Sequence, residues 1–255
     1  MKIIRKFPVV ILSLLFCAGP SPAQVQKKVI ISEDLELSEL VPGIYVHTSY
    51  ASTGSYRHVP ANGLLVVNGT EALMIDSPWN DSLTMLLTNW LSDSIGIRVT
   101  GFIPGHWHED CMGGLGWLQS QGIKTWSGEH TREIAVQKGL PVPDVGFTDS
   151  LNIIFGQREI RCYYPGPAHS TDNIVILIEP ENILFAGCLV KSMGSTNLGN
   201  TADGDLKSYS STMENIIKRF PDPQIVVPGH GACGGAELLR HTLELSRATA
   251  GISTE

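Results

Sequence analysis

The stretch GHWHEDCMGG, residues 105–114, is the most informative part of the sequence. It follows an apolar run, residues 97–103, that is typical of a buried strand, and it precedes a short segment that favours a helix. His106, His108 and Asp110 alternate within it, so an extended backbone would point all three side chains to one side. Neutral imidazole and carboxylate are both zinc ligands. We therefore predict a metal site on this strand-to-helix loop.

Three further segments place a candidate ligand beside a predicted strand. Residues 166–173 present His169 at a turn before a strand, residues 185–188 end a strand at Cys188, and residues 227–231 end another at His230. Loops on a rigid sheet are where functional groups usually lie. Taken alone, His169 and His230 could each be an ordinary core histidine, and Cys188 could be a small buried thiol. Four such segments in one chain favour a common site.

The remaining pattern predicts an α/β protein. Hydrophobic residues make up 42% of the chain and charged residues 17%, which excludes a disordered protein. Asn68-Gly69 between two apolar runs predicts a hairpin. Strands are predicted at 63–67, 71–75, 97–103, 151–155, 159–164, 173–178, 183–186 and 224–227, and helices at 83–91, 115–119, 206–220 and 238–248. Strand clusters followed twice by helices indicate two sheets packed face to face with helices outside.

The first 23 residues are typical of a secretory signal peptide. A basic start precedes an apolar run at 9–18 and small residues at 21–23. The run is too short for a membrane-spanning helix, which needs about 20 residues, and the bulky Phe16 disfavours lipidation of Cys17. We expect residues 24–255 to form a single exported, periplasmic domain without stable membrane association.

Charge and cysteine content narrow the class of protein further. The net charge is −7, and because Lys2, Arg5 and Lys6 of the leader contribute +3, the rest of the chain carries −10. Such a charge argues against nucleic acid as a partner, since phosphate binding needs a basic surface. Four cysteines follow the leader: Cys111, Cys162, Cys188 and Cys233. In an oxidising compartment two disulfides would be the default expectation, and the spacing alone does not assign them.

The order of the four motifs resembles the metallo-β-lactamase superfamily. It runs His-x-His-x-Asp, Gly-x-x-His-x-x-Asp-Asn, Gly-Cys and Pro-Gly-His-Gly, and the resemblance covers about residues 41–248. Cys188 narrows it to the first subclass of the class B β-lactamases, and residues 139–164 are similar to the Bacteroides-type zinc enzymes. The resemblance implies a four-layer αββα sandwich of two packed mixed sheets with helices outside.

The resemblance also implies two zinc ions per chain. The first would be held by His106, His108 and His169, and the second by Asp110, Cys188 and His230. Three neutral imidazoles leave zinc its double charge, which lowers the pKa of bound water towards ~7. The second site is more electron-rich and suits an anionic leaving group. Cys188 must then be a thiolate outside any disulfide, while pairing among the other three cysteines stays open.

Four residues acquire roles in substrate handling through the same resemblance. Lys191 would pair with the substrate carboxylate, Asn200 would help to polarise the lactam carbonyl, and Asp110 would orient the attacking hydroxide. Tyr56, on a flap at residues 53–56, would offer an aromatic face. We expect Gly204 to loosen the loop that follows Asn200. Trp107 and Glu109 occupy the variable positions of the first motif. One is bulky and the other is charged, and both would lie next to the metals, so the range of substrates stays open.

The sequence therefore predicts a dizinc metallo-β-lactamase. Metal-bound hydroxide would hydrolyse the β-lactam amide of penicillins, cephalosporins and carbapenems and confer antibiotic resistance, with the protein acting as a monomer. A thioesterase or phosphodiesterase of the superfamily is the first alternative, but those relatives usually carry a histidine where Cys111 stands and a bridging aspartate where Cys188 stands. A non-catalytic zinc-binding protein is the second, although structural zinc sites are usually closed four-ligand shells.

Overall fold

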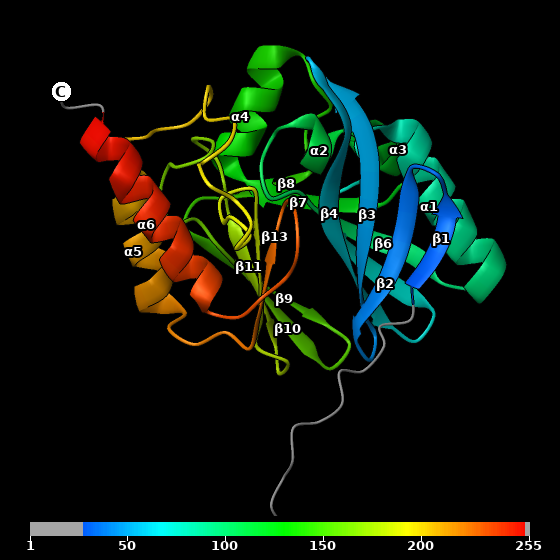
Figure 1. Cartoon of the computed structure of the whole chain (residues 1–255). Coiled ribbons are helices and arrows are strands. Elements are labelled where there is room, and N and C mark those ends of the chain that lie inside the picture. Colours follow the sequence, from blue (N-terminus) through cyan, green and yellow to red (C-terminus); the bar gives the residue numbers. More distant parts are fainter. Residues whose placement is uncertain (1–27, 253–255) are drawn as a thin grey trace, which may run out of the picture.

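Two β-sheets pack face to face and helices cover both outer faces, in a computed structural model that describes residues 28–252 (Figure 1). The predicted signal peptide, residues 1–23, lies outside the described residues. The first sheet has eight strands in sequence order, antiparallel from β1 to β5 and parallel from β5 to β8. These are β1 Lys28–Ser32, β2 Leu35–Val41, β3 Ile44–Thr53, β4 Tyr56–Asn68, β5 Glu71–Ile75, β6 Arg98–Ile103, β7 Lys124–Gly128 and β8 Val145–Phe147.

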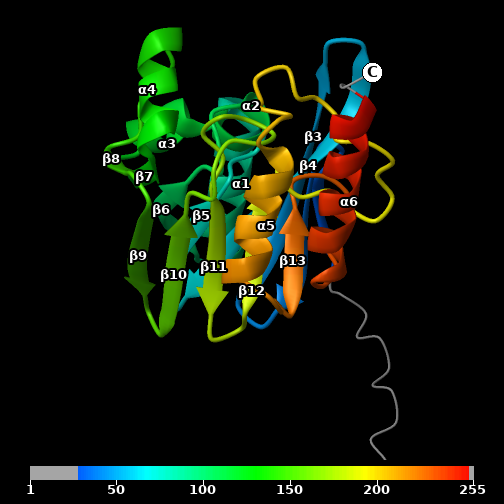
Figure 2. The same cartoon turned by 90° about the vertical axis from the view of Figure 1, so that its left-hand side faces the viewer.

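The second sheet has five strands in the order β13-β12-β11-β10-β9, with only β12 and β13 parallel. They are β9 Ser150–Phe155, β10 Arg158–Tyr163, β11 Val175–Glu179, β12 Ile183–Gly187 and β13 Ile225–Pro228. Figure 2 shows α5 and α6 in front of this sheet. The helices are α1 Asp81–Ile95, α2 Glu109–Met112, α3 Leu115–Ser120, α4 Glu129–Lys138, α5 Tyr209–Arg219 and α6 Glu237–Ile252.

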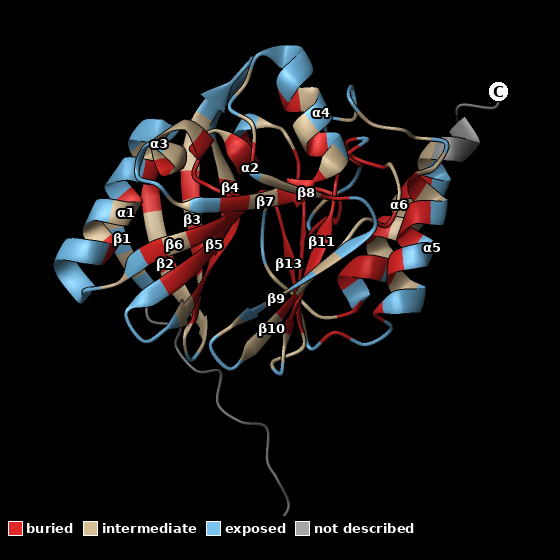
Figure 3. Ribbon diagram, turned by 180° about the vertical axis from the view of Figure 1, so that it is seen from behind, coloured by how far each residue is buried: buried red, intermediate tan, exposed pale blue. Residues whose placement is uncertain are grey.

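Alternation along the strands produces the four layers. In β4, Leu64 and Val66 enter the core between the sheets, while Leu65 faces the helices α1 to α4. In β11, Ile176 joins the core between the sheets and Leu177 packs under α5 and α6. Because successive side chains of a strand point to opposite faces, a continuous apolar run fills two cores at once. Figure 3 shows the buried residues gathered along the strands and the exposed ones on the outer faces of the helices.

The predicted αββα sandwich is confirmed, and each predicted strand and helix is present with boundaries shifted by a few residues. The hairpin at Asn68-Gly69 joins β4 to β5, and Gly69 adopts a φ of 61°, a conformation that glycine reaches without a steric penalty. The sequence pattern did not predict β1 to β3, β7, β8, α2 or α4, whose residues are mostly mixed in polarity. Among the described residues, no helix combines the length and apolar character needed to cross a bilayer.

Asn62 of β4 ties the first sheet to the loop that follows β13. Its Nδ2 donates to the carbonyls of Pro228 at 3.0 Å and Gly231 at 2.8 Å, and its backbone N–H donates to the carbonyl of Gly229 at 2.8 Å. Its Oδ1 accepts a hydrogen bond from the Thr48 hydroxyl at 3.0 Å. The first three bonds set the position of residues 228–231, and so of His230, against the first sheet, and the fourth holds the Asn62 side chain in place.

We expect Asn62→Ala to lower the free energy of unfolding by about 1–3 kcal/mol, because it leaves buried carbonyl groups without donors. Chemical denaturation monitored by circular dichroism measures the change. Asn152→Ala, at an exposed position of β9, is the matched control and should be neutral. Equal stability of Asn62→Ala and the control would show that the side chain does not tie the sheets together.

Candidate metal centre

The first motif changes conformation in its middle. β6 ends at Ile103, and His108 is the N-cap of the short helix α2, which contains Asp110. The extended backbone expected across His106, His108 and Asp110 is therefore not observed, because α2 begins at Glu109. The turn of helix brings Asp110 into a second group of side chains, while its carboxylate stays within 4.8 Å of a ring nitrogen of His106.

Three histidines form the first group. Nε2 of His106 lies 2.9 Å from Nδ1 of His108. The ring centroid of His169 lies 4.9 Å from that of His106 and 5.3 Å from that of His108. One ring nitrogen of each residue lies within 4.8 Å of the others, a spacing that suits a single metal ion. His169 reaches this group from the loop between β10 and β11.

Asp110, Cys188 and His230 form the second group. Oδ2 of Asp110 lies 3.1 Å from Nε2 of His230, and Sγ of Cys188 lies 3.3 Å from each of these two atoms. Cys188 follows β12 and His230 follows β13, so the parallel pairing of these strands places both at the same edge of the sheet. The other ring nitrogen of His230, Nδ1, hydrogen-bonds the Pro60 carbonyl at 2.5 Å, which orients the ring.

Both groups fit metal ions in their chemistry as well as their spacing. Neither ring nitrogen of His169 has a hydrogen-bond partner among the described residues, although both atoms are buried. A buried polar atom without a partner costs about 1–3 kcal/mol, and a metal ion that binds one of the two nitrogens offsets part of this cost. Imidazole nitrogen, carboxylate oxygen and thiolate sulfur are the donor types that zinc prefers.

Burial and mutual contacts favour the protonation states that a metal needs in the first group. Burial lowers the pKa of His106 to about 3, and burial together with the neighbouring His106 lowers the pKa of His169 well below its ordinary value. Both rings are therefore neutral at pH 7, with lone pairs available for a metal ion.

In the second group the charges are paired instead. A hydrogen bond from Cys111 lowers the pKa of the Cys188 thiol to about 6. Burial opposes ionisation of Asp110 and His230. The hydrogen bond between them nevertheless lowers the pKa of Asp110, and the charge of Cys188 raises that of His230 well above its ordinary value. A metal ion that binds this group displaces the imidazolium proton.

Two buried aspartates hold the first motif in place, and the sequence analysis gave neither a role. Oδ2 of Asp172 accepts hydrogen bonds from the Trp107 backbone N–H at 3.0 Å and from the Thr131 hydroxyl at 2.8 Å. Oδ1 of Asp76, directly after β5, accepts from the Gly105 backbone N–H. Asp172 belongs to the quoted motif around His169, but Asp76 stands in no motif. Its signal in the sequence is a charged residue at the end of an apolar run.

All four described cysteines are free thiols. Cys188 thus lies outside any disulfide, as expected, and the pairing left open for the other three does not occur. The Cys111 sulfur lies within 4.8 Å of the donor atoms of His106, Asp110 and Cys188. Burial raises the pKa of Cys111 well above its ordinary value, so it is a thiol that donates to Cys188.

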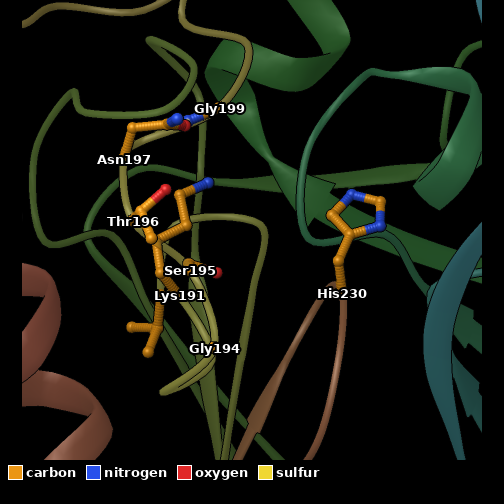
Figure 4. A pocket seen from close by; sticks show the side chains of 8 residues that line it. Lys191, Gly194, Ser195, Thr196, Asn197, Gly199 and His230 are labelled. Carbon is orange, nitrogen blue, oxygen red and sulfur yellow. The ribbon is translucent and has the colours of Figure 1, made fainter.

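Lys191 lies beside the second group, in the wall of a cavity of about 330 Å³. Its Nζ donates to the Cys188 carbonyl at 2.6 Å, and the side chain is largely buried. Figure 4 shows His230 across the cavity from Lys191 and from the loop that carries Thr196 and Asn197. The cavity thus adjoins the group formed by Asp110, Cys188 and His230.

The structure does not bring Asn200 or Tyr56 into contact with the two groups. Asn200 is exposed, and its Oδ1 accepts a hydrogen bond from the Ala202 N–H at 3.2 Å within its own turn. Tyr56 is 72% exposed at the tip of the hairpin that joins β3 and β4. His47, His58, His130 and His241 also lie outside both groups, as expected.

Comparison with known proteins places this arrangement in a family. Residues 56–230 match the model of the metallo-β-lactamase superfamily. The chain is 42% identical to the metallo-β-lactamase type 2 of Bacteroides fragilis over 92% of its length and 94% of that protein, and 38% identical to that of Bacillus cereus over 87% of each. A metallo-β-lactamase structure from Pontibacter korlensis superimposes with a TM-score of 0.80 at 37% identity, covering 84% of this chain and 99% of that one.

The chain belongs to the metallo-β-lactamase superfamily. Its two sheets with outer helices are the fold of that family, and its activity is that of a hydrolase. The family relationship implies zinc as the metal, and the two groups of donor atoms described above are compatible with it.

We expect Cys188→Ser to weaken the binding of one zinc ion by at least about tenfold, since even residues that merely support a ligand contribute that much to metal affinity. Serine keeps the size of the side chain but does not ionise near pH 7. Zinc content after dialysis against a weak chelator, together with the rate of lactam hydrolysis, gives the readout. Cys162→Ser, in the core between the sheets, is the matched control. Unchanged zinc content and rate would remove Cys188 from the centre.

Proposed function

We propose that this protein opens the amide bond of β-lactam antibiotics with two zinc ions bound at the adjacent groups described above. The observation that carries the proposal is the close approach of two donor sets, one of three neutral imidazoles and one of carboxylate, thiolate and imidazole. The names of relatives that match almost the whole chain support the same substrate class. Penicillins, cephalosporins and carbapenems are the proposed substrates.

Each group has a distinct part in this proposal. His106, His108 and His169 hold one ion, and Asp110, Cys188 and His230 hold the other. Zinc bound there lowers the pKa of water towards ~7 and polarises a carbonyl oxygen. Open coordination positions distinguish such catalytic centres from closed structural ones. Each proposed ligand set has three residues, and Cys111, which lies near the second set, is a thiol with a raised pKa and is not counted among its ligands.

The carboxylate of Asp110 accepts and orients a proton of the attacking water, because it stays ionised at neutral pH and lies within 4.8 Å of a ring nitrogen of His106 in the first group. Lys191 holds the substrate carboxylate at the wall of the cavity. Asn200 and Tyr56 reach substrate only when their loops close over it, since both side chains are exposed here.

The family relationship also supports a proposal for the cellular location of the protein. We propose that the chain is exported to the periplasm through cleavage of residues 1–23 and acts there as a monomer. β-Lactam antibiotics act in that compartment, so hydrolysis at this place confers resistance. The sequence of the leader supports export, and the negative charge of the mature chain supports small-molecule substrates over nucleic acids.

A hydrolysis panel on the purified zinc-loaded protein tests this function. We expect multiple turnovers of a carbapenem, a cephalosporin and a penicillin, followed by ultraviolet absorbance. Incubation with a strong chelator should abolish the rate, and added zinc should restore it, because the proposed reaction relies on the bound metal to activate water. A thioester and a phosphodiester serve as comparison substrates. Turnover of either of these without turnover of any lactam would overturn the proposal.

Lys191→Ala tests the role given to the lysine. We expect KM for a carboxylate-bearing lactam to rise about tenfold with little change in kcat, because a charge-assisted hydrogen bond contributes about 1.5–3 kcal/mol and serves binding. Lys218→Ala, an exposed lysine of α5, is the matched control. A loss confined to kcat would contradict a binding role for Lys191.

A further inference from the structure

We propose that Asp203, Gly204 and Asp205, named here the 203–205 segment, couple the loop that carries Asn200 to the three-histidine group, with Asp203 as a positioning residue for His108. The inference relies on the proposed function only in taking the three histidines as zinc ligands. It concerns residues that carry no assigned role in the reaction and that follow the cavity-lining loop at residues 194–199.

The first contact is made by the side chain of Asp203. Its Oδ2 lies 3.0 Å from Nε2 of His108. The other nitrogen of the ring, Nδ1, is the one that lies 2.9 Å from Nε2 of His106. A carboxylate that accepts the Nε2 proton fixes the tautomer, so the lone pair stays on Nδ1, which faces the metal position. Asp203 therefore sets both the orientation of the His108 ring and its donor atom.

The second contact is made by the backbone of Gly204. A β-carbon at this position would lie 2.3 Å from the Ala168 carbonyl oxygen and 2.7 Å from that of His169. Only glycine allows the loop to approach the backbone of a metal-ligand residue so closely. The expectation that Gly204 loosens the loop is therefore wrong: the missing side chain permits tight packing.

The third contact is made by Asp205, the residue that follows Gly204. The backbone N–H of Asp205 donates to the Ala168 carbonyl at 2.8 Å. Its carboxylate accepts hydrogen bonds from the Ser208 hydroxyl at 2.9 Å and the Ser208 N–H at 3.1 Å, at the N-cap of α5. The segment is thus attached to two histidine-bearing loops and to a helix. Asn200, three residues earlier, belongs to an exposed turn.

The contact between Asp203 and His108 does not serve mainly to stabilise the fold. The side chain of Asp203 is 42% exposed and that of His108 is 14% exposed, and ion pairs at such positions contribute about 0–1 kcal/mol to stability. A hydrogen bond to the second nitrogen of a metal-binding histidine has a much larger effect, about 10–100-fold, on metal affinity. Zinc affinity therefore distinguishes a positioning role from a merely structural one.

The experiment measures zinc affinity by competition with a chromophoric chelator, on the full mature protein and without any lactam. We expect Asp203→Ala to weaken one of the two zinc-binding constants about 10–100-fold and to leave the other nearly unchanged. Asp203→Asn keeps an oxygen acceptor for the Nε2 proton and should recover part of the loss. Thr201→Ala, on the same loop, removes neither contact and is the matched control.

Gly204→Ala separates coupling through the backbone from a local effect of the Asp203 carboxylate. It leaves Asp203 and the three histidines intact but forces the loop away from residues 168 and 169. We expect it to weaken the same zinc constant and to raise KM for a lactam, with the melting temperature checked to confirm folding. In nitrogen-15 spectra of the zinc-loaded protein, the His108 Nε2 proton should exchange faster in Asp203→Ala than in the unaltered protein.

Zinc constants in Asp203→Ala equal to those of Thr201→Ala would overturn the positioning role. An effect of Asp203→Ala without any effect of Gly204→Ala on zinc binding would overturn the coupling of the loop. Because both zinc readouts omit the lactam, a protein that binds zinc as expected but hydrolyses no lactam would refute the proposed function and leave the inference standing.

Discussion

The metal centre depends on holding buried ring nitrogens, a carboxylate and a sulfur atom close together, although the His169 nitrogens have no protein partner among the described residues. The two nitrogens of His169 are buried and unpaired, and those of His106 and His108 that face each other are only 2.9 Å apart. Such an arrangement is unfavourable by itself, because buried polar groups lose their water without gaining a hydrogen bond. The surrounding protein must therefore impose it, and a bound cation stabilises it.

Rigid elements impose the arrangement from several directions. The parallel strands β12 and β13 bring Cys188 and His230 to one sheet edge. Asn62 binds the His230 loop to the other sheet, and Asp172 binds the backbone of Trp107, between two histidines. None of these contacts involves a donor atom of the centre. They hold the donors in place because each attaches a loop to a buried strand or helix, whose own packing resists movement.

The loop that carries Asn200 combines an exposed turn with a fixed base. Its middle makes local hydrogen bonds, while its last residues lie against Ala168 and His108. The chain thus places an exposed turn directly beside a segment that is packed against metal-ligand residues.

The sequence by itself determined the layers and the members of the centre. Alternating apolar strands, the Asn68-Gly69 turn and helical spacing follow from local periodicity, and His106, His108, His169, Asp110, Cys188 and His230 stand in short motifs at strand ends. The family resemblance implied how these six divide into two groups, and only the tertiary structure decided their geometry, because α2 begins at Glu109 and carries Asp110 towards Cys188 and His230. The roles of Asp76, Asn62 and Asp203 could not be predicted from local sequence either, since their partners are 29, 166 and 95 residues distant along the chain. The prediction for Gly204 was wrong for the same reason. The local sequence shows only that a glycine backbone can adopt many conformations, whereas the close approach to residues 168 and 169 is set by the tertiary structure.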